Sequence, residues 1–158
     1  MALQFRRVVT GHDASGRAIV KIDEIAKNLV SSRPGATSCV VWTSQGFPVD
    51  NTGDEDAGLR KTGTTLDNGT VFRILELAPG ASPRNDRTDS IDYAVVMSGE
   101  IDMELDGSTV HLKAGDVLVQ RGTIHNWVNR GTRPCVIAFV LIAAKPVEVG
   151  GKVLHAQG

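Results

Sequence analysis

Asp86, Thr88 and Asp92 are separated by even numbers of residues, and His125 lies on a second predicted strand. In an extended strand, residues of the same parity lie on one face. If a barrel brings the two strands together, two carboxylates and one imidazole converge inside it. Mn(II), Fe(II) and Zn(II) accept such ligands. We therefore predict Asp86, Asp92 and His125 as metal ligands, with open positions for water or substrate.

Each of these side chains also has a structural interpretation. Asp86 could be a turn or capping residue among its polar neighbours, and Asp92 could be a structural carboxylate paired with an arginine. His125 could simply hydrogen-bond within its strand. Thr88 is a poor metal ligand, so its hydroxyl is expected to orient a ligand or to pack. The sequence alone leaves these alternatives open.

Further pocket candidates lie close to these residues. Trp127 is on the same face of its strand as the histidine, where it could stack on a planar substrate or pack in the core. Gln120 could point its amide into the cavity. Arg87 is predicted to orient the substrate, because a guanidinium pairs with a carboxylate through two hydrogen bonds. Arg84 and Arg121 are further donors near the mouth, with a solvated loop as the default.

The elements that would hold these residues are short strands. Runs of β-type residues separated by turn residues predict strands at Phe5–Thr10, Ala18–Ile22, Thr37–Thr43, Thr70–Leu77, Asp92–Met97, Glu100–Leu105, Thr109–Leu112, Val117–Gln120, His125–Asn129 and Cys135–Ile142. Ten short strands favour a sandwich or barrel. The spacing of apolar residues predicts one short helix over Ile22–Val30. The long connection Gln45–Thr65 is predicted as a solvated loop over a pocket.

The composition excludes several classes of protein. The 158 residues carry 17 Lys and Arg and 18 Asp and Glu, which argues against a nucleic-acid binder and gives no reason for a membrane contact. The longest apolar run, Val136–Ala144, is too short to span a bilayer as a helix.

Cys39 and Cys135 are predicted to be buried, free thiols. His12, His111 and His155 are predicted on the surface. A cytoplasmic location is expected.

Two motifs in the chain resemble those of the cupin family. In the first motif, a Gly is followed by two metal-binding His one residue apart, then by a Glu and a second Gly. Gly80, Asp86, Thr88, Asp92 and Gly99 match its spacing. The residue types differ, because Asp86 and Thr88 stand in the places of the two His.

The second motif combines Gly-Asp, a short strand, a Pro-x-Gly turn, a His and an Asn. Gly115-Asp116 opens it here, and Gly122, His125 and Asn129 continue it. Gln120-Arg121-Gly122 replaces the turn, one residue early. The resemblance covers roughly Thr70–Ile142 and points to small single-domain cupins of the conserved-barrel type (cupin 2).

The resemblance implies an all-β fold, a double-stranded β-helix (jelly-roll barrel) with an N-terminal strand extension. We expect the extension at residues 1–66, the barrel at 67–145 and a C-terminal tail at 146–158. Small cupins further imply a homodimer in which the N-terminal strands pack on the partner.

For function, the resemblance favours a small-molecule enzyme, and a metal-dependent lyase is the leading hypothesis. It would decarboxylate or dehydrate a small carboxylic or phenolic compound, with Zn, Mn or Fe as the expected divalent metal. His125 and Asp92 would hold the metal, Asp86 would be a third ligand or general base, and Arg87 would orient the substrate. The alternatives are a metal-free binding barrel, acting as a sensor or carrier, and a degenerate cupin with only a structural role.

Overall fold

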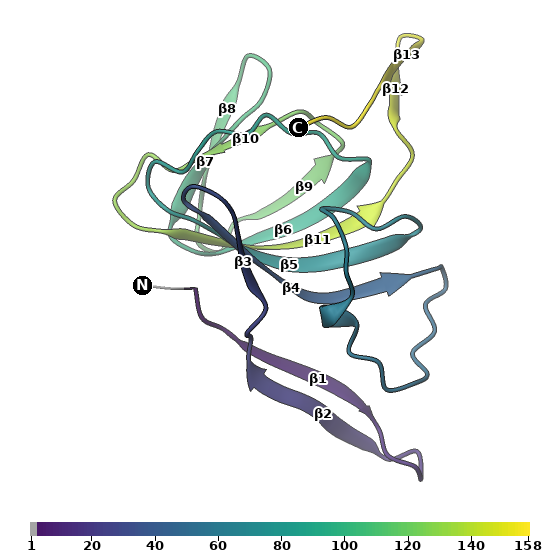
Figure 1. Cartoon of the computed structure of the whole chain (residues 1–158). Helices are drawn as coiled ribbons and strands as arrows, with labels where there is room; N and C mark the ends of the chain where they lie inside the picture. The colour runs from purple at the N-terminus through teal and green to yellow at the C-terminus, as the bar shows by residue number, and fades with distance from the viewer. Residues whose placement is uncertain (1–2) are drawn as a thin grey trace.

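The secondary structure consists almost entirely of strands (Figure 1). The computed structural model describes residues 3–158. Its elements are β1 (Arg6–His12), β2 (Ala18–Ile25), β3 (Leu29–Arg33), β4 (Ala36–Gln45), the 3-10 turn η1 (Ala57–Leu59), β5 (Gly69–Leu77), β6 (Ser90–Ser98), β7 (Glu100–Glu104), β8 (Thr109–Lys113), β9 (Val117–Arg121), β10 (Asn126–Val128), β11 (Cys135–Ala143), β12 (Val147–Val149) and β13 (Lys152–Leu154). The all-β prediction is confirmed.

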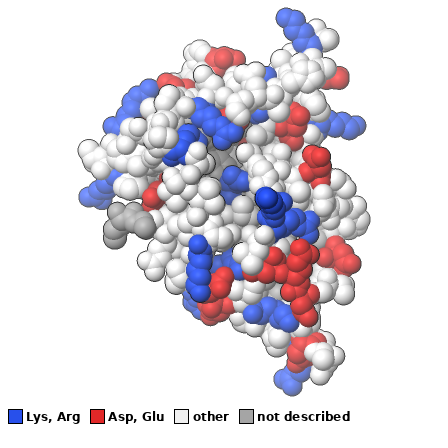
Figure 2. All heavy atoms as spheres, viewed as in Figure 1, with Lys and Arg blue, Asp and Glu red and all other residues white. Residues whose placement is uncertain are grey.

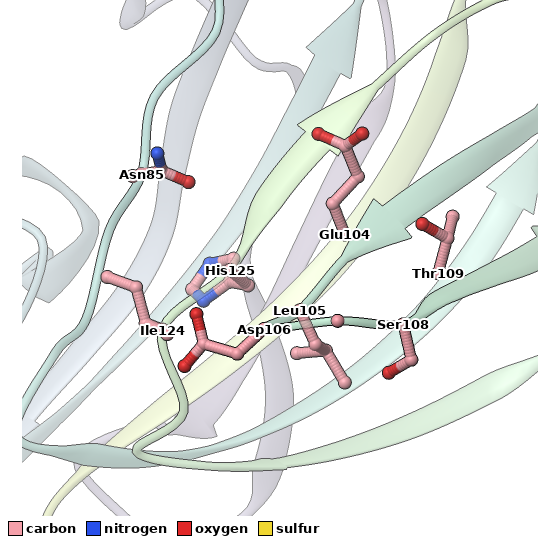
Figure 3. A pocket seen from close by; sticks show the side chains of 9 residues that line it. Asn85, Glu104, Leu105, Asp106, Ser108, Thr109, Ile124 and His125 are labelled. Carbon is pink, nitrogen blue, oxygen red and sulfur yellow. The ribbon is translucent and has the colours of Figure 1, made fainter.

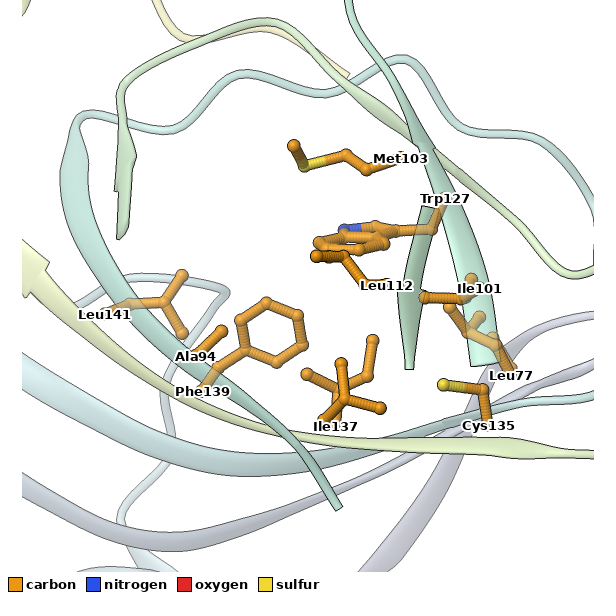
Figure 4. Close-up of a cluster of buried hydrophobic side chains, with 12 residues drawn as sticks. Leu77, Ala94, Ile101, Met103, Leu112, Trp127, Cys135, Ile137, Phe139 and Leu141 are labelled. Carbon is orange, nitrogen blue, oxygen red and sulfur yellow. The ribbon is translucent and has the colours of Figure 1, made fainter. Parts of the chain in front are cut away.

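Two sheets enclose the core. The larger has the strand order β3-β4-β5-β11-β6-β9, and the smaller has the order β10-β7-β8. The inward side chains of both sheets form one apolar cluster (Figure 4), and its largest members are Leu77, Ile101, Met103, Leu112, Trp127, Ile137, Phe139 and Leu141. Strand β6 shows how strand geometry produces this core, because every second side chain from Ser90 to Val96 is buried and those between are half-buried or exposed.

Two of the turns that join the strands contain a glycine with a positive φ. Gly99 has a φ of 75°, and it links β6 to β7. Asp106-Gly107 lies in the hairpin that joins β7 to β8, with Gly107 at a φ of 71°. Both positions need a backbone conformation that residues with a side chain rarely adopt.

The helix predicted over Ile22–Val30 is wrong. Residues 22–25 finish β2, which pairs with β1, and Leu29 begins β3. Between them, the Asn28 amide donates hydrogen bonds to the carbonyls of Val40 and Gly58, at 3.0 and 3.2 Å. Cross-strand hydrogen bonds and this amide therefore override a weak helical pattern.

The N-terminal strands divide into two groups. Strands β3 and β4 fall within the expected extension and belong to the larger sheet, where β3 pairs with β4 and β4 pairs with β5. Strands β1 and β2 form a separate hairpin that projects away from the barrel (Figure 1). Arg7 fastens this hairpin, since its buried guanidinium donates to Asp56 at 2.8 and 2.6 Å and to Glu24 at 2.8 Å.

The remaining predictions concern thiols, histidines and membranes. Cys39 and Cys135 are both buried and free, as predicted. The side chains of His12, His111 and His155 are all exposed, as predicted. In the described part of the chain, no helix has the length and apolar character needed to cross a membrane.

Candidate functional site

A polar group lies inside the barrel at one end of the apolar core. Asp92 on β6 and Gln120 on β9 occupy paired positions, and only 4% and 3% of their surfaces are exposed. Paired residues of adjacent strands project to the same side. Because Ala94, the next residue on that side of β6, belongs to the core, Asp92 and Gln120 face the interior.

Asp92 ends a chain of hydrogen-bonded hydroxyls. The Ser90 hydroxyl donates to Oδ1 of Asp92 at 2.6 Å, and the oxygens of Thr88 and Ser90 are 2.6 Å apart. The expected parity of residues 88 to 92 thus places three polar side chains in line. Burial raises the pKa of Asp92, and the bond from Ser90 and the nearby His125 only partly offset this effect. The carboxyl is therefore biased toward its neutral form.

His125 is held at the edge of the same interior. Its backbone forms two 3.0 Å hydrogen bonds with Asp86, so both side chains lie on one side. Nδ1 of His125 lies 2.9 Å from the carbonyl oxygen of Thr123. A carbonyl only accepts, so Nδ1 carries the proton, and in the neutral ring Nε2 offers a lone pair. Within residues 3–158, Nε2 has no hydrogen-bond partner.

The metal centre expected at these residues is not preformed. Across residues 3–158, no three His, Cys, Asp or Glu side chains are grouped so that they could hold an ion. Asp86 lies 3.6 Å from a guanidinium nitrogen of Arg84. Asp92 accepts from Ser90, and its raised pKa opposes the ionised form that ligation requires. The three residues therefore share one region without fitting a metal.

The side chain of Gln120 places an oxygen without a hydrogen-bond partner in the interior, among the described residues. Its Nε2 donates to the sulfur of Met103 at 3.5 Å. Its Oε1 is buried and has no partner in the described part of the chain. Buried polar atoms are nearly always satisfied, so a ligand that donates a hydrogen bond fits here. The expectation that Gln120 points its amide into the cavity agrees with this placement.

Two other candidate residues, Trp127 and Arg87, lie outside the polar group, and core packing was one of the two roles expected for Trp127. Trp127 is a core residue with edge-to-face contacts, its ring centroid 6.0 Å from His125 and 5.8 Å from Phe139. Arg87 exchanges backbone hydrogen bonds with Gln157 of the C-terminal tail and donates to the carbonyl of His155 at 3.5 Å. Since Arg87 neighbours Asp86 in an extended segment, its side chain points to the opposite side.

A pocket of about 560 Å³ adjoins His125 (Figure 3). The β7–β8 turn forms one wall, from Glu104 to Thr109, and Asn85, Ile124 and His125 form the other. Figure 3 shows the His125 ring among the side chains of Asn85, Ile124 and Asp106. Most of the lining side chains are polar, which suits a small polar molecule.

Two arginines that sequence reasoning missed also lie near Asp86. Arg73 on β5 pairs with the core residue Phe139, so it faces the interior. Arg33 ends β3 and donates from Nε to the carbonyl of Ser82 at 3.0 Å. Arg73 could have been found from sequence, because it has the parity of Val71, Leu75 and Leu77 on a strand with one apolar face.

Comparison with known proteins identifies a matching family model and similar sequences. Residues 73–142 match the family model described as Cupin domain. The chain is 39% identical to phomopsin biosynthesis cluster protein C' of Diaporthe leptostromiformis, over 94% of this chain and 83% of that protein. It is 33% identical to the cupin-domain-containing oxidoreductase fogC of Aspergillus ruber, over 92% and 76%.

Among solved structures, the polyketide cyclase RemF of Streptomyces resistomycificus has a similar fold. The TM-score is 0.53, with 16% identity over 77% of each chain. At this identity the likeness concerns the fold alone. It confirms the predicted double-stranded β-helix of jelly-roll type.

Proposed function

This chain belongs to the cupin family, and from that premise we propose that it is an acid–base lyase that dehydrates a small carboxylic or phenolic compound. Its relatives include biosynthesis cluster proteins and cupin-domain oxidoreductases, which supports a small-molecule enzyme of the cupin type. The relatives' names leave the reaction of this chain open, so the side chains inside the barrel carry the rest of the proposal.

The single observation behind the proposal is the fixed tautomer of His125. With Nδ1 bonded to the Thr123 carbonyl, Nε2 is the atom that can take a proton. The ring lies at the end of the core and borders a polar pocket. A general base needs this combination of a defined lone pair and access to substrate.

Asp92 is the matching acid. Burial raises its pKa and so favours the protonated carboxyl, which can donate a proton. In the proposed dehydration, Nε2 of His125 removes a proton from carbon, and Asp92 protonates the departing hydroxyl, which leaves as water. The hydroxyls of Ser90 and Thr88 then form a route by which Asp92 regains a proton. No step uses a metal, because the predicted ligands do not fit one.

The test is turnover of a panel of small hydroxy acids and hydroxylated phenolic acids, followed by mass spectrometry. We expect loss of water from at least one compound, and a chelator should not reduce the rate. His125→Asn should lower kcat by about 10²–10⁴-fold, the usual contribution of a general base. His111→Asn is the control, since His111 is an exposed histidine on β8.

Other outcomes would identify the alternatives. Loss of carbon dioxide would replace dehydration by decarboxylation, and a rate restored only by added Mn(II), Fe(II) or Zn(II) would establish the metal-dependent lyase. Binding without turnover across the whole panel would favour the metal-free carrier or sensor. An unchanged kcat in His125→Asn would overturn the assignment of the base.

A second candidate is an oxidation or reduction, which the names of the relatives favour. The same mass spectra separate the two, because a redox reaction changes the hydrogen count of the product without removing water. It would also consume an added electron donor or acceptor, which the dehydration does not.

A further inference from the structure

The strongest unassigned feature of the barrel is a group of three arginine side chains near a single carboxylate. Arg33, Arg73 and Arg84 all lie near Asp86, and the charge of Arg84 lowers the pKa of both Arg33 and Arg73. Burial is the larger cause of each shift. Of these three arginines, only Arg84 makes an ion pair with a described residue, and its partner is Asp86 at 3.6 Å. The positive charge of this group is therefore not balanced by the chain.

Arg73 has the clearest geometry of the three. Its register with Phe139 on β11 directs it to the inner face of the larger sheet. Nη2 donates to the carbonyl of Gly63 at 2.9 Å, which places the long loop of residues 46–68 against this end of the barrel. Nε is buried and has no hydrogen-bond partner among the described residues. A guanidinium has five N–H donors, and only one is used.

An uncompensated, partly buried guanidinium is unfavourable unless something balances it. Figure 2 shows Lys and Arg atoms gathered around a hollow near the middle of the face that it presents. Arg73 sits next to Phe139, so an anion bound to it would also meet apolar surface. A small organic acid has both the negative charge that balances the guanidinium and an apolar part that can contact Phe139.

We propose that Arg73 binds the carboxylate of the substrate inside the barrel, with Arg33 and Arg84 adding positive charge around it. This inference rests on the proposed function only where it identifies the bound acid as the substrate. Asp86 connects the two regions, because it is bonded to the backbone of His125 and paired with Arg84. A carboxylate on Arg73 would thus hold the rest of the molecule near Asp92 and His125. Of the compounds considered above, the proposal selects the carboxylic acids.

The choice of a carboxylate over a phosphate follows from the donors. A planar carboxylate is satisfied by one guanidinium through two parallel hydrogen bonds. A phosphate usually takes several donors, often backbone N–H groups at a helix N-terminus, and the described residues contain no α-helix. The oxygen of Gln120, which needs a donor, would suit a hydroxyl or amine elsewhere on the same molecule.

Benzoate, benzamide and inorganic phosphate are the probes, and calorimetric titration is the measurement. We expect benzoate to bind at least tenfold more tightly than benzamide, which has the same shape and no charge. Arg73→Gln should weaken benzoate binding at least tenfold. Arg73→Lys should weaken it less, because the charge remains and the fork of donors is lost. Arg33→Gln should give a smaller loss than Arg73→Gln.

Two controls make the result interpretable. Arg121→Gln removes an exposed arginine on β9, next to Gln120 and hence on the opposite face of the strand, and should leave benzoate binding unchanged. Thermal melting checks that each variant folds, and Arg73→Lys provides the test if Arg73→Gln does not. Equal binding of benzoate and benzamide, tighter binding of phosphate than of benzoate, or no effect of either Arg73 variant would overturn the proposal.

Failure here and failure of the proposed function are distinguishable. In the parent protein, benzoate binding tests the carboxylate site without any turnover, so the two proposals can fail separately. Arg73-dependent binding of benzoate without turnover of any acid would leave the carboxylate site standing and reject the lyase. Turnover confined to compounds without a carboxylate would reject the site and leave the lyase.

Discussion

Burial and hydrogen bonding have opposite effects on the pKa of the Asp92 carboxyl. Burial is the largest cause and raises its pKa, while the bond from Ser90, and the charge that His125 carries when it is protonated, lower it. The folded chain therefore holds this proton more tightly than the unfolded chain. The stability that this proton contributes is complete below the ordinary Asp pKa and is lost as pH rises through the raised pKa.

Asp92→Asn should consequently gain stability over the parent as pH rises from about 4 to about 8. Asn cannot ionise, and its side-chain oxygen can still accept from Ser90. Chemical denaturation of both proteins across this range measures the difference. Asp106→Asn, in the exposed β7–β8 turn, is the control and should show no such trend. A difference that shrinks with rising pH would contradict the assignment.

Parity predicted the inward position of Asp92, because period-two patterns follow directly from strand geometry. Parity also gave Thr88 and Ser90 a shared face, while their hydrogen-bond chain to Asp92 depends on rotamers that no pattern contains. The predicted role of Arg87 rested on a weaker argument. Its position was judged by nearness to Asp86, although adjacent residues of a strand face opposite sides.

At the scale of elements, the turn between β6 and β7 depends on Gly99. A Cβ there would lie 2.5 Å from the carbonyl oxygen of Pro134 and 3.0 Å from Cα of Cys135. Gly107, in the β7–β8 turn, has a similar φ, and its Cβ would meet nothing within 4 Å. The two glycines thus share a conformational requirement and differ in the space around them.

Gly99→Ala should destabilise the protein by clearly more than Gly107→Ala. Each substitution carries a conformational cost of about 1–2 kcal/mol for a left-handed residue, and Gly99→Ala adds the collision with the backbone. Urea denaturation measures both free energies of unfolding. Equal losses in the two variants would show that the backbone near Pro134 moves aside easily.

The sequence located the central strands well, since Thr70–Leu77 and Cys135–Ile142 nearly coincide with β5 and β11. It missed β3 and the short β12–β13 hairpin. The first, Leu29–Arg33, is set by pairing with β4, which lies later in the chain. The second has only three residues on each side, too few for a hydrophobic period to appear.

At the scale of the whole molecule, two apolar surfaces remain uncovered. On the outer face of the larger sheet, Tyr93, Val95 and Met97 of β6 lie beside Val117 and Val119 of β9, with Val117 74% exposed. The β1–β2 hairpin presents a second surface, where the exposed Val8, Val20 and Ile25 share one face. A two-stranded hairpin is marginally stable in water when nothing covers it.

We propose that a second copy of the chain covers these surfaces in a homodimer. One chain carries both surfaces, and in a twofold dimer each contact that one chain makes with its partner is repeated by the partner. A stable interface of this kind usually buries roughly 1,200–2,000 Å² in total, and a sheet face together with a projecting hairpin offers a broad area of this type. Because Val119 is 58% exposed on β9, it is a suitable position to test.

Sedimentation equilibrium should show a dimer for the parent and a monomer for Val119→Lys. Removing the buried valine costs about 1.5–3 kcal/mol, and an unpaired charge in the interface adds to this, so the dimer should weaken by about 10²-fold or more. Val110→Lys introduces the same charge at a 40% exposed position on β8, in the other sheet, and should remain dimeric. Val20→Lys, on the hairpin, should weaken the dimer as Val119→Lys does. A monomeric parent, or a dimer that tolerates both substitutions, would exclude this interface.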